Sequence, residues 1–283
     1  RLGGWRTGLV AAALAAVFEP FVYQSSIAMP TSLILCAHLV ALWLVVRTSG
    51  METDPERRSQ PPTAAWLLTG LALALAVLSH GTGLAVAAAL LVWLVLRPGS
   101  SGVRRRLVVA ALVVGGLVPP LAAVAARNYA VSGDLVLLTS NAGKNLYIGH
   151  NPVADGTFNP HWFPVWGAGL RTYIQGDERT PEDPAPSEVS RWLAGKALAF
   201  IRDNPERTAA LTWRKIRLFL NWYETCQDDN PYFAERYSRV LSLPLPGFWL
   251  IGSLGLAGIV PAVFERRRYG PLLICLGAEL AAF

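Results

Sequence analysis

The sequence alternates between long apolar runs and short segments that carry clusters of arginine. A helix needs about 20 apolar residues to cross a bilayer, and most of these runs approach that length. Hydrophobic residues make up 53% of the 283 residues and charged residues 16%, whereas soluble domains carry about 25% charged residues. The sequence therefore predicts an α-helical polytopic membrane protein with about seven spans. The expected spans lie near residues 7–24, 27–46, 64–79, 82–96 and 107–126, with two more within 241–283.

The two ends of the chain are both unusual for a complete membrane protein. The first residue is Arg1 rather than methionine, and the last apolar run, 271–283, stops without a polar flank. We therefore expect a piece of a longer protein, with its last span cut short.

The arginines predict the topology of the spans. Short loops rich in Lys and Arg lie in the cytoplasm, so an even number of crossings should separate successive clusters. Residues 64–96 lie between two clusters and should cross twice, turning near His80 at the outer surface. A single long tilted helix is the alternative, but it would break the charge rule. The clusters are Arg1 and Arg6; Arg47, Arg57 and Arg58; Arg97, Arg104, Arg105 and Arg106; and Arg266, Arg267 and Arg268.

Residues 127–240 form one polar block with thirteen basic and thirteen acidic residues. Because the block is neutral, the net charge of +6 comes from the arginine clusters between apolar runs, which argues against a nucleic-acid partner. One crossing before the block and one after it, between the cytoplasmic clusters at Arg106 and Arg266, place the block outside the cytoplasm. We therefore divide the chain into a membrane bundle (1–126), an extracytoplasmic domain (127–240) and further membrane spans (241–283).

The local pattern of this block predicts a mixed α/β domain. Leu135–Leu138 and Asn145–Ile148 have the composition of short extended segments, and Ser140–Gly143 has that of the turn between them. A helix is expected after Ser187 as its N-cap. A second helix is expected after Asn204, with Pro205 in its first position.

His80 is a first candidate for chemistry, because it lies beside two glycines at the predicted outer end of a membrane hairpin. A cation or donor there would meet a lipid phosphate, although a histidine at an interface also caps turns. The four histidines are dispersed along the sequence, and we expect no metal site.

A second set of candidates lies within residues 127–152, a segment rich in amides and glycines that also contains a lysine. Amides donate and accept hydrogen bonds without net charge, which suits sugar hydroxyls and phosphates. The alternative is a turn network that only shapes the domain. These candidates are Arg127, Asn141, Lys144, Asn145 and Asn151, with Glu19 and Glu224 as further acidic candidates.

Two stretches carry a family resemblance: Arg127-Asn128-Tyr129 with Gly133 four residues on, and Thr139–Pro152 with its repeated asparagines and glycines. This order of motifs after the spans resembles bacterial polytopic glycosyltransferases of the GT-C type. The branch it resembles is that of protein O-mannosyltransferases and the lipid A aminoarabinose transferase. Leu78–Gly81 stands where members carry a basic residue followed by proline.

The resemblance implies transfer of a sugar from a polyprenyl-phosphate carrier to a protein, lipid or glycan acceptor, at the outer face of a bacterial plasma membrane. In such enzymes a carboxylate in the first outer loop acts as the catalytic base. The resemblance does not firmly imply a cofactor. This chain begins beyond that loop, so we expect the catalytic acid upstream and assign none. The residues that would remain are His80, Lys144 and the nearby amides on the phosphate and sugar side.

Two other classes of function remain open from the sequence. One is a transporter or flippase, in which Glu19, His80 and broken helices serve a pathway. The other is a non-catalytic membrane scaffold with an outer interaction domain. The lack of an internal repeat and the concentration of polar residues outside the spans favour the enzyme.

Overall fold

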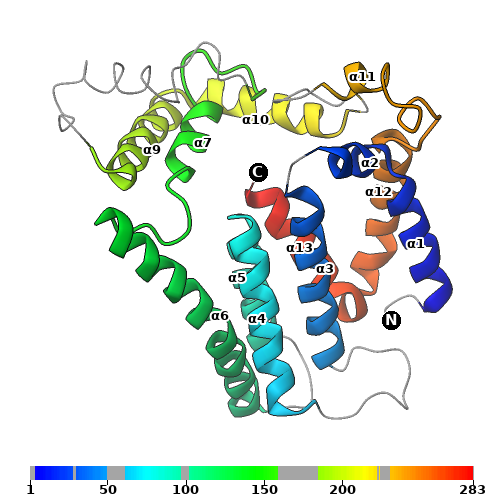
Figure 1. Ribbon diagram of the computed structural model, residues 1–283, viewed down its shortest axis with the longest axis vertical. Coiled ribbons are helices and arrows are strands. Elements are labelled where there is room, and N and C mark those ends of the chain that lie inside the picture. The colour runs from blue at the N-terminus through cyan, green and yellow to red at the C-terminus, as the bar shows by residue number, and fades with distance from the viewer. Residues whose placement is uncertain are drawn as a thin grey trace. The chain divides into compact units, whose positions relative to one another are not determined.

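The computed structural model describes residues 4–27, 30–49, 61–96, 102–158, 184–221, 223 and 230–282. These residues form helices and turns, and no strand occurs among them (Figure 1). The chain divides into two compact units, which are described separately. Unit 1 comprises Arg1–Val124 and Glu235–Phe283, and unit 2 comprises Ala125–Ala234.

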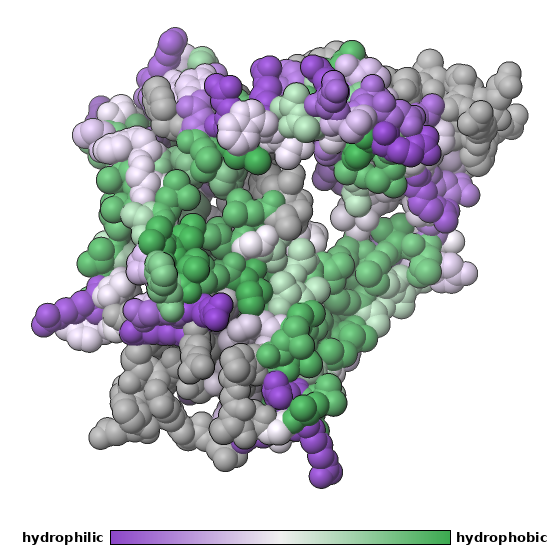
Figure 2. Space-filling model, turned by 180° about the vertical axis from the view of Figure 1, so that it is seen from behind, coloured by the Kyte–Doolittle hydropathy of each residue, from purple (hydrophilic) through white to green (hydrophobic). Residues whose placement is uncertain are grey.

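Unit 1 contains most of the apolar helices. α3 packs against α4, and α13 packs against α5 and α12. Figure 2 shows hydrophobic residues covering much of the visible surface of these helices. Such a surface suits a lipid environment, because soluble proteins rarely leave large apolar areas exposed. The helices are α1 (Trp5–Val17), α2 (Glu19–Ser26), α3 (Thr31–Thr48), α4 (Thr63–Ser79), α5 (Gly83–Leu96), α6 (Val103–Ser132), α12 (Phe248–Phe264) and α13 (Arg266–Ala282).

Two of these helices are long and apolar enough to cross a membrane, α3 with 18 residues and α6 with 30. A third span results if α1 and α2, which meet at a bend of 56°, are counted as one broken span. α4, α5 and α12 are apolar but shorter, at 17, 14 and 17 residues. The expected helical membrane protein is confirmed, whereas the expected number of about seven spans stays a prediction.

The first expected span, 7–24, is bent rather than straight. Phe18 has extended backbone angles, and α2 begins immediately after it with Pro20 in its first turn. Proline lacks the N–H that would continue the helix, and its ring clashes with the carbonyl four residues earlier. The bend therefore follows from Pro20.

Residues 64–96 form two helices with a break at His80, as the hairpin prediction required. His80 is extended, with φ −155° and ψ 137°, and Gly83 starts α5. A Cβ on Gly83 would lie 2.8 Å from the carbonyl oxygen of Ala76, so the chain folds back against the end of α4. Only glycine allows so close a turn between the two helices.

α4 and α6 approach each other backbone to backbone. A Cβ on Gly70 would collide with the carbonyl of Val113, and one on Gly116 with the carbonyl of Leu67. Small residues let helices in membranes pack this closely. Leu73 on α4 and Val113 on α6 are fully buried beside these glycines, so this contact lies in the core of unit 1.

Unit 2 is built from α7 (Ala142–Gly149), α9 (Pro186–Asp203), α10 (Pro205–Phe219) and the short α11 (Pro231–Ala234). α7 packs on α9, and Gly143 N–H donates to Ser190 Oγ at 3.0 Å. The apolar core of this pair consists of Tyr147, Ile148, Val189, Leu193 and Ala197.

The predicted extended segment Asn145–Ile148 was wrong, because these residues lie inside α7. A short apolar run does not distinguish a strand from a buried helix face, and burial of Tyr147 and Ile148 against α9 decided for helix. Leu135–Leu138 does not form a strand either; Val136 instead accepts a hydrogen bond from Asn128. The mixed α/β domain is therefore corrected to a helical one for the described part of the block.

The two helices expected after residues 187 and 204 are present, but Ser187 is not an N-cap. α9 begins at Pro186 with Ala185 as its N-cap residue. Ser187 donates its hydroxyl to Asp134 Oδ1 at 2.6 Å and its backbone N–H to Oδ2 at 2.8 Å. A carboxylate from 53 residues earlier thus serves the orphan N–H of this helix end.

Candidate functional site

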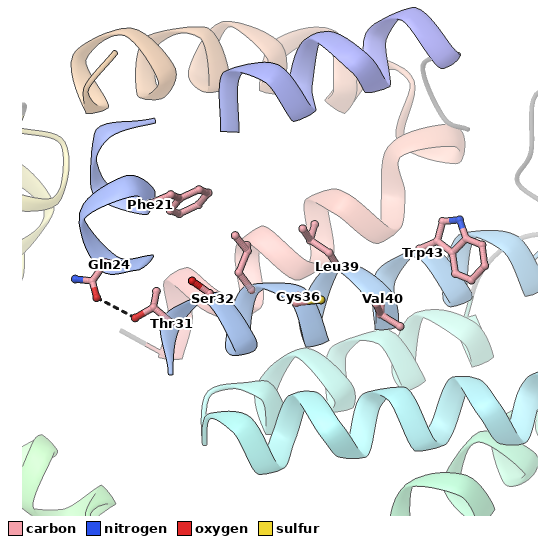
Figure 3. Close-up of a pocket in the computed structure, with 9 residues that line it drawn as sticks. Phe21, Gln24, Thr31, Ser32, Cys36, Leu39, Val40 and Trp43 are labelled. Carbon is pink, nitrogen blue, oxygen red and sulfur yellow. Dashed lines mark hydrogen bonds between the residues drawn. The ribbon is translucent and has the colours of Figure 1, made fainter. Parts of the chain in front are cut away.

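A groove of about 360 Å³ runs between α2 and α3 in unit 1 (Figure 3). The α3 residues recur at helical spacing and so share one face. From Ser32 to Trp43 this face is about 16 Å long at 1.5 Å per residue. The lining residues are Phe21, Gln24, Thr31, Ser32, Leu35, Cys36, Leu39, Val40 and Trp43.

Polar groups gather at one end of the groove. Thr31 donates its hydroxyl to Gln24 Oε1 at 3.0 Å, and Ser32 lies beside Thr31 on α3 (Figure 3). Beyond Cys36 the lining is apolar up to Trp43. An apolar trough with a hydroxyl and an amide at one end is suited to an amphiphile.

An ionisable pair joins α3 to α13. His38 Nε2 lies 3.3 Å from Glu279 Oε1, and the two side chains are 17% and 36% exposed. His38 Nδ1 lies 2.8 Å from the carbonyl of Ile34, which can only accept, so this nitrogen carries a proton. Nε2 is therefore the ring nitrogen that faces the carboxyl group of Glu279.

The His80 turn is held by its own neighbours. His80 Nδ1 lies 2.9 Å from Thr82 Oγ1 and accepts a longer contact from the Thr82 N–H at 3.4 Å. The histidine thus caps the break between α4 and α5. Its side chain is exposed, and no hydrogen bond to Nε2 is seen within the described residues.

Three of the predicted site residues share a face of the α7 region in unit 2. Asn141 precedes the helix, and Lys144 and Asn145 follow at the spacing of three and four residues that places side chains together. Asn145 is exposed, and Asn141 and Lys144 are half-buried. Arg127 is exposed on the C-terminal part of α6.

Asn151 differs from the other amides, because it is fully buried. Its Nδ2 donates to the carbonyls of Tyr147 at 2.8 Å and Ile148 at 3.2 Å, and its Oδ1 accepts from the N–H of Val153 at 2.9 Å. These bonds close the C-terminal end of α7. Asn151 therefore shapes the turn, and its inclusion among sugar-binding candidates is not supported by this geometry.

A basic face of α10 covers the loop that follows α7. Lys215 Nζ lies over Gly149, where a Cβ would come within 2.7 Å, and Arg207 donates to the carbonyl of Ala154 at 3.1 Å. Burial lowers the pKa of Lys215. Burial and the charge of Lys215 lower the pKa of His150.

Asp155 lies in the same loop. Partial burial raises its pKa, but two hydrogen bonds from Thr157 and the charge of Arg214 outweigh this and the pKa is lowered overall. The carboxylate is therefore fixed as a charged group that organises the loop against α10. No sequence pattern predicts this cluster, because residues 149–157 and α10 are far apart in the chain.

The predicted residues are distributed over both units. His80 and Glu19 belong to unit 1, and Glu19 N–H donates to the carbonyl of Pro246 at 3.1 Å. Arg127, Asn141, Lys144, Asn145 and Asn151 belong to unit 2. The pairing of His80 with Lys144 stays a prediction, and Glu224 lies outside the described residues. No group of three or more metal-ligating side chains occurs in the part of the chain that the structure describes.

Comparison with known proteins gives one match. Residues 1–123 match the family model of dolichyl-phosphate-mannose-protein mannosyltransferases. No curated protein and no solved structure matches the chain. The match covers the helices that form the groove, the His80 turn and most of α6, and it confirms the resemblance to mannosyltransferases.

Proposed function

We propose that this chain, which resembles membrane mannosyltransferases, is part of a glycosyltransferase that takes a sugar from a polyprenyl-phosphate carrier. The observation that carries the proposal is the family match over residues 1–123, since it falls on the apolar helices. The acceptor is a protein, lipid or glycan, and the reaction takes place at the outer face of the membrane.

The α2–α3 groove supports a lipid-linked donor. Its apolar floor accommodates a stretch of isoprenoid chain, and Gln24, Thr31 and Ser32 offer an amide and hydroxyls where the chain meets a polar head. Burying apolar chain surface contributes about 25 cal/mol per Å². A shallow, open groove is sufficient here, because the surrounding lipid covers the rest of the chain.

Groove variants test this role in the full-length protein. Leu39→Trp should fill the groove and raise KM severalfold for a long-chain polyprenyl-phosphate-mannose donor, with a smaller effect on a donor of one or two isoprene units. Leu33→Trp is the matched control, because Leu33 lies on the same helix, is exposed and does not line the groove. An unchanged KM in Leu39→Trp would remove the groove from the donor site, and no transfer by the wild-type enzyme would refute the proposed function.

His80 and Lys144 are proposed as donors to the carrier phosphate. Charge develops on the phosphate as the sugar departs, and preorganised donors stabilise it. The exposed imidazole, fixed by Thr82 through Nδ1, leaves Nε2 for this task. Loss of one such donor reduces the rate about a hundredfold, and His80→Gln should restore part of it where His80→Ala does not. Near-normal turnover of His80→Ala and Lys144→Ala at matched expression would exclude both residues.

A transporter or flippase is the second candidate, and the His38–Glu279 pair favours it. Ionisable side chains on apolar helices usually mark ion or substrate pathways in membrane proteins, and this pair joins the apolar α3 to α13. Reconstituted protein should then move a fluorescent lipid-linked sugar across vesicles, and His38→Ala should stop it. Sugar transfer that survives His38→Ala, without any movement of the lipid, would decide for the enzyme.

A further inference from the structure

The orientation of α10 within unit 2 is opposite to that of an ordinary surface helix. In a soluble domain the apolar stripe of a helix faces its own core and the charged face meets water. In α10 the basic residues Arg207 and Lys215 instead lie against the loop of residues 149–157. Leu211, on the same side, is 3% exposed.

The opposite side of α10 carries an outward apolar stripe. Its members are spaced by four, three and four residues and so lie on one face. Trp213 is 62% exposed, Ile216 45% and Leu220 48%. The outward stripe consists of Ala209, Trp213, Ile216 and Leu220, and it extends for about 16 Å.

The surroundings of the stripe are those of an interfacial helix. The exposed Arg217 lies along its edge, where a long basic side chain reaches lipid headgroups. Beyond its C-terminal end the rings of Tyr223 and Tyr232 stack at 4.7 Å. Trp and Tyr are enriched at the membrane–water boundary, because one part of each ring system is apolar and the other polar.

The chain itself keeps unit 2 close to a membrane. The unit begins within α6, which is long and apolar enough to cross a bilayer. After the unit the chain continues into the apolar helix α12. A lipid surface is therefore within reach of the stripe in every molecule, whereas a soluble partner would have to be recruited.

We propose that α10 lies along the membrane surface, with its outward stripe at the level between headgroups and acyl chains and with Arg217 in the headgroup layer. The helix then acts as a fixed lipid-binding face of unit 2. This inference is independent of the proposed sugar transfer, because it needs only the exposed stripe and the adjoining apolar helices.

Spin labels measure this arrangement directly. Single cysteines replace Trp213, Ile216 or Leu220 in full-length protein whose native cysteines are changed to serine. The labelled protein is reconstituted in vesicles of phosphatidylcholine and phosphatidylglycerol. Labels on the stripe should collide more with oxygen, which concentrates in the bilayer, than with a water-soluble nickel chelate.

Leu198 provides a matched control on α9. It is apolar and 57% exposed, but Arg191 and Arg202 share its face, so its label should meet water. Stripe labels that collide with the nickel chelate as often as the Leu198→Cys label would overturn the proposal. Stripe labels that are immobile and inaccessible to both reagents would overturn it as well, because the stripe would then be packed on protein.

Discussion

Asn151 illustrates how one amide can resemble a ligand-binding residue in sequence and be structural in the fold. It lies among asparagines and glycines that suit a sugar, and Asn141 and Asn145 nearby are accessible enough to touch one. Asn151 differs from Asn141 and Asn145 in being buried, and its burial depends on the packing of α7 on α9. The sequence pattern therefore predicts a candidate segment but does not distinguish its buried amide from its accessible ones.

We expect Asn151→Ala to destabilise the protein. It removes three hydrogen bonds at the end of α7. The Tyr147 carbonyl keeps the bond from the His150 N–H, whereas the Ile148 carbonyl and the Val153 N–H lose the side chain that pairs with them, and each such loss costs about 1–3 kcal/mol. Thermal unfolding of purified protein in detergent measures the effect. Asn145→Ala, at an exposed position, serves as control and should leave the melting temperature nearly unchanged. Equal melting temperatures for the two variants would contradict the structural role of Asn151.

Asp134 fixes the first turn of α9 in a pH-dependent way. Hydrogen bonds from Ser187 lower its pKa from the ordinary value of 3.8. A carboxyl whose folded pKa is lowered stabilises the fold above its unfolded pKa, and this contribution is lost as pH falls through the folded pKa. Ser187→Ala should therefore speed hydrogen exchange of the first α9 amides at neutral pH, and the difference from wild type should shrink at acid pH.

The pair Arg202–Asp203 is the control for this effect. It is exposed, with a contact of 2.8 Å, and surface ion pairs add little to stability. Asp203→Asn should leave exchange in α9 as it is in the wild type. If Ser187→Ala has no effect at any pH, then the Asp134 contact does not hold the helix end.

At the level of elements, sequence periodicity and breakers predicted most helices but not how they meet. Glycine and proline marked the starts of α5 and α10 for physical reasons that are local, whereas the bend at Pro20 before α2 was not predicted. The groove between α2 and α3 and the His38–Glu279 contact involve residues whose proximity depends on helix packing. No sequence pattern predicts these contacts, because apolar helices offer many equivalent ways to pack.

The α4–α6 crossing should respond differently to alanine at two adjacent glycines. Gly116→Ala would drive a methyl group into the carbonyl of Leu67, whereas a Cβ on Gly115 would lie at an ordinary 3.6 Å from Leu67 Cδ2. Overpacking costs about 1–3 kcal/mol, while alanine in place of glycine favours a helix by about 1 kcal/mol. Gly116→Ala should lower the melting temperature, and Gly115→Ala should hold or raise it. A higher melting temperature for Gly116→Ala than for Gly115→Ala would disprove the close approach of α4 and α6.

At the level of the whole molecule, the sequence predicted a helical membrane protein, and the apolar helices and the family match agree with it. The side of the membrane on which unit 2 lies stays a prediction, since it follows only from the distribution of arginines. Helix lengths do not reveal it, because a helix has the same length in either direction of crossing.

Thiol labelling on intact cells tests the topology. Single cysteines at Asn141 and Asp177 should react with an impermeant reagent, whereas cysteines at Arg57 and Arg105 should react only after the cells are opened. We expect this labelling pattern because short loops rich in arginine lie in the cytoplasm. Labelling at position 105 but not at 177 in intact cells would invert the model.

The attachment of α9 to Asp134 and α7 has a practical consequence for protein engineering. Two hydrogen bonds from Ser187, one from Gly143 and a shared apolar core link these elements across the chain. A protein divided between residues 158 and 184 should therefore reassemble when its two fragments are produced together. Such complementation would turn unit 2 into a reporter of successful insertion, because the fragments would meet only when the helices on both sides had entered the same membrane.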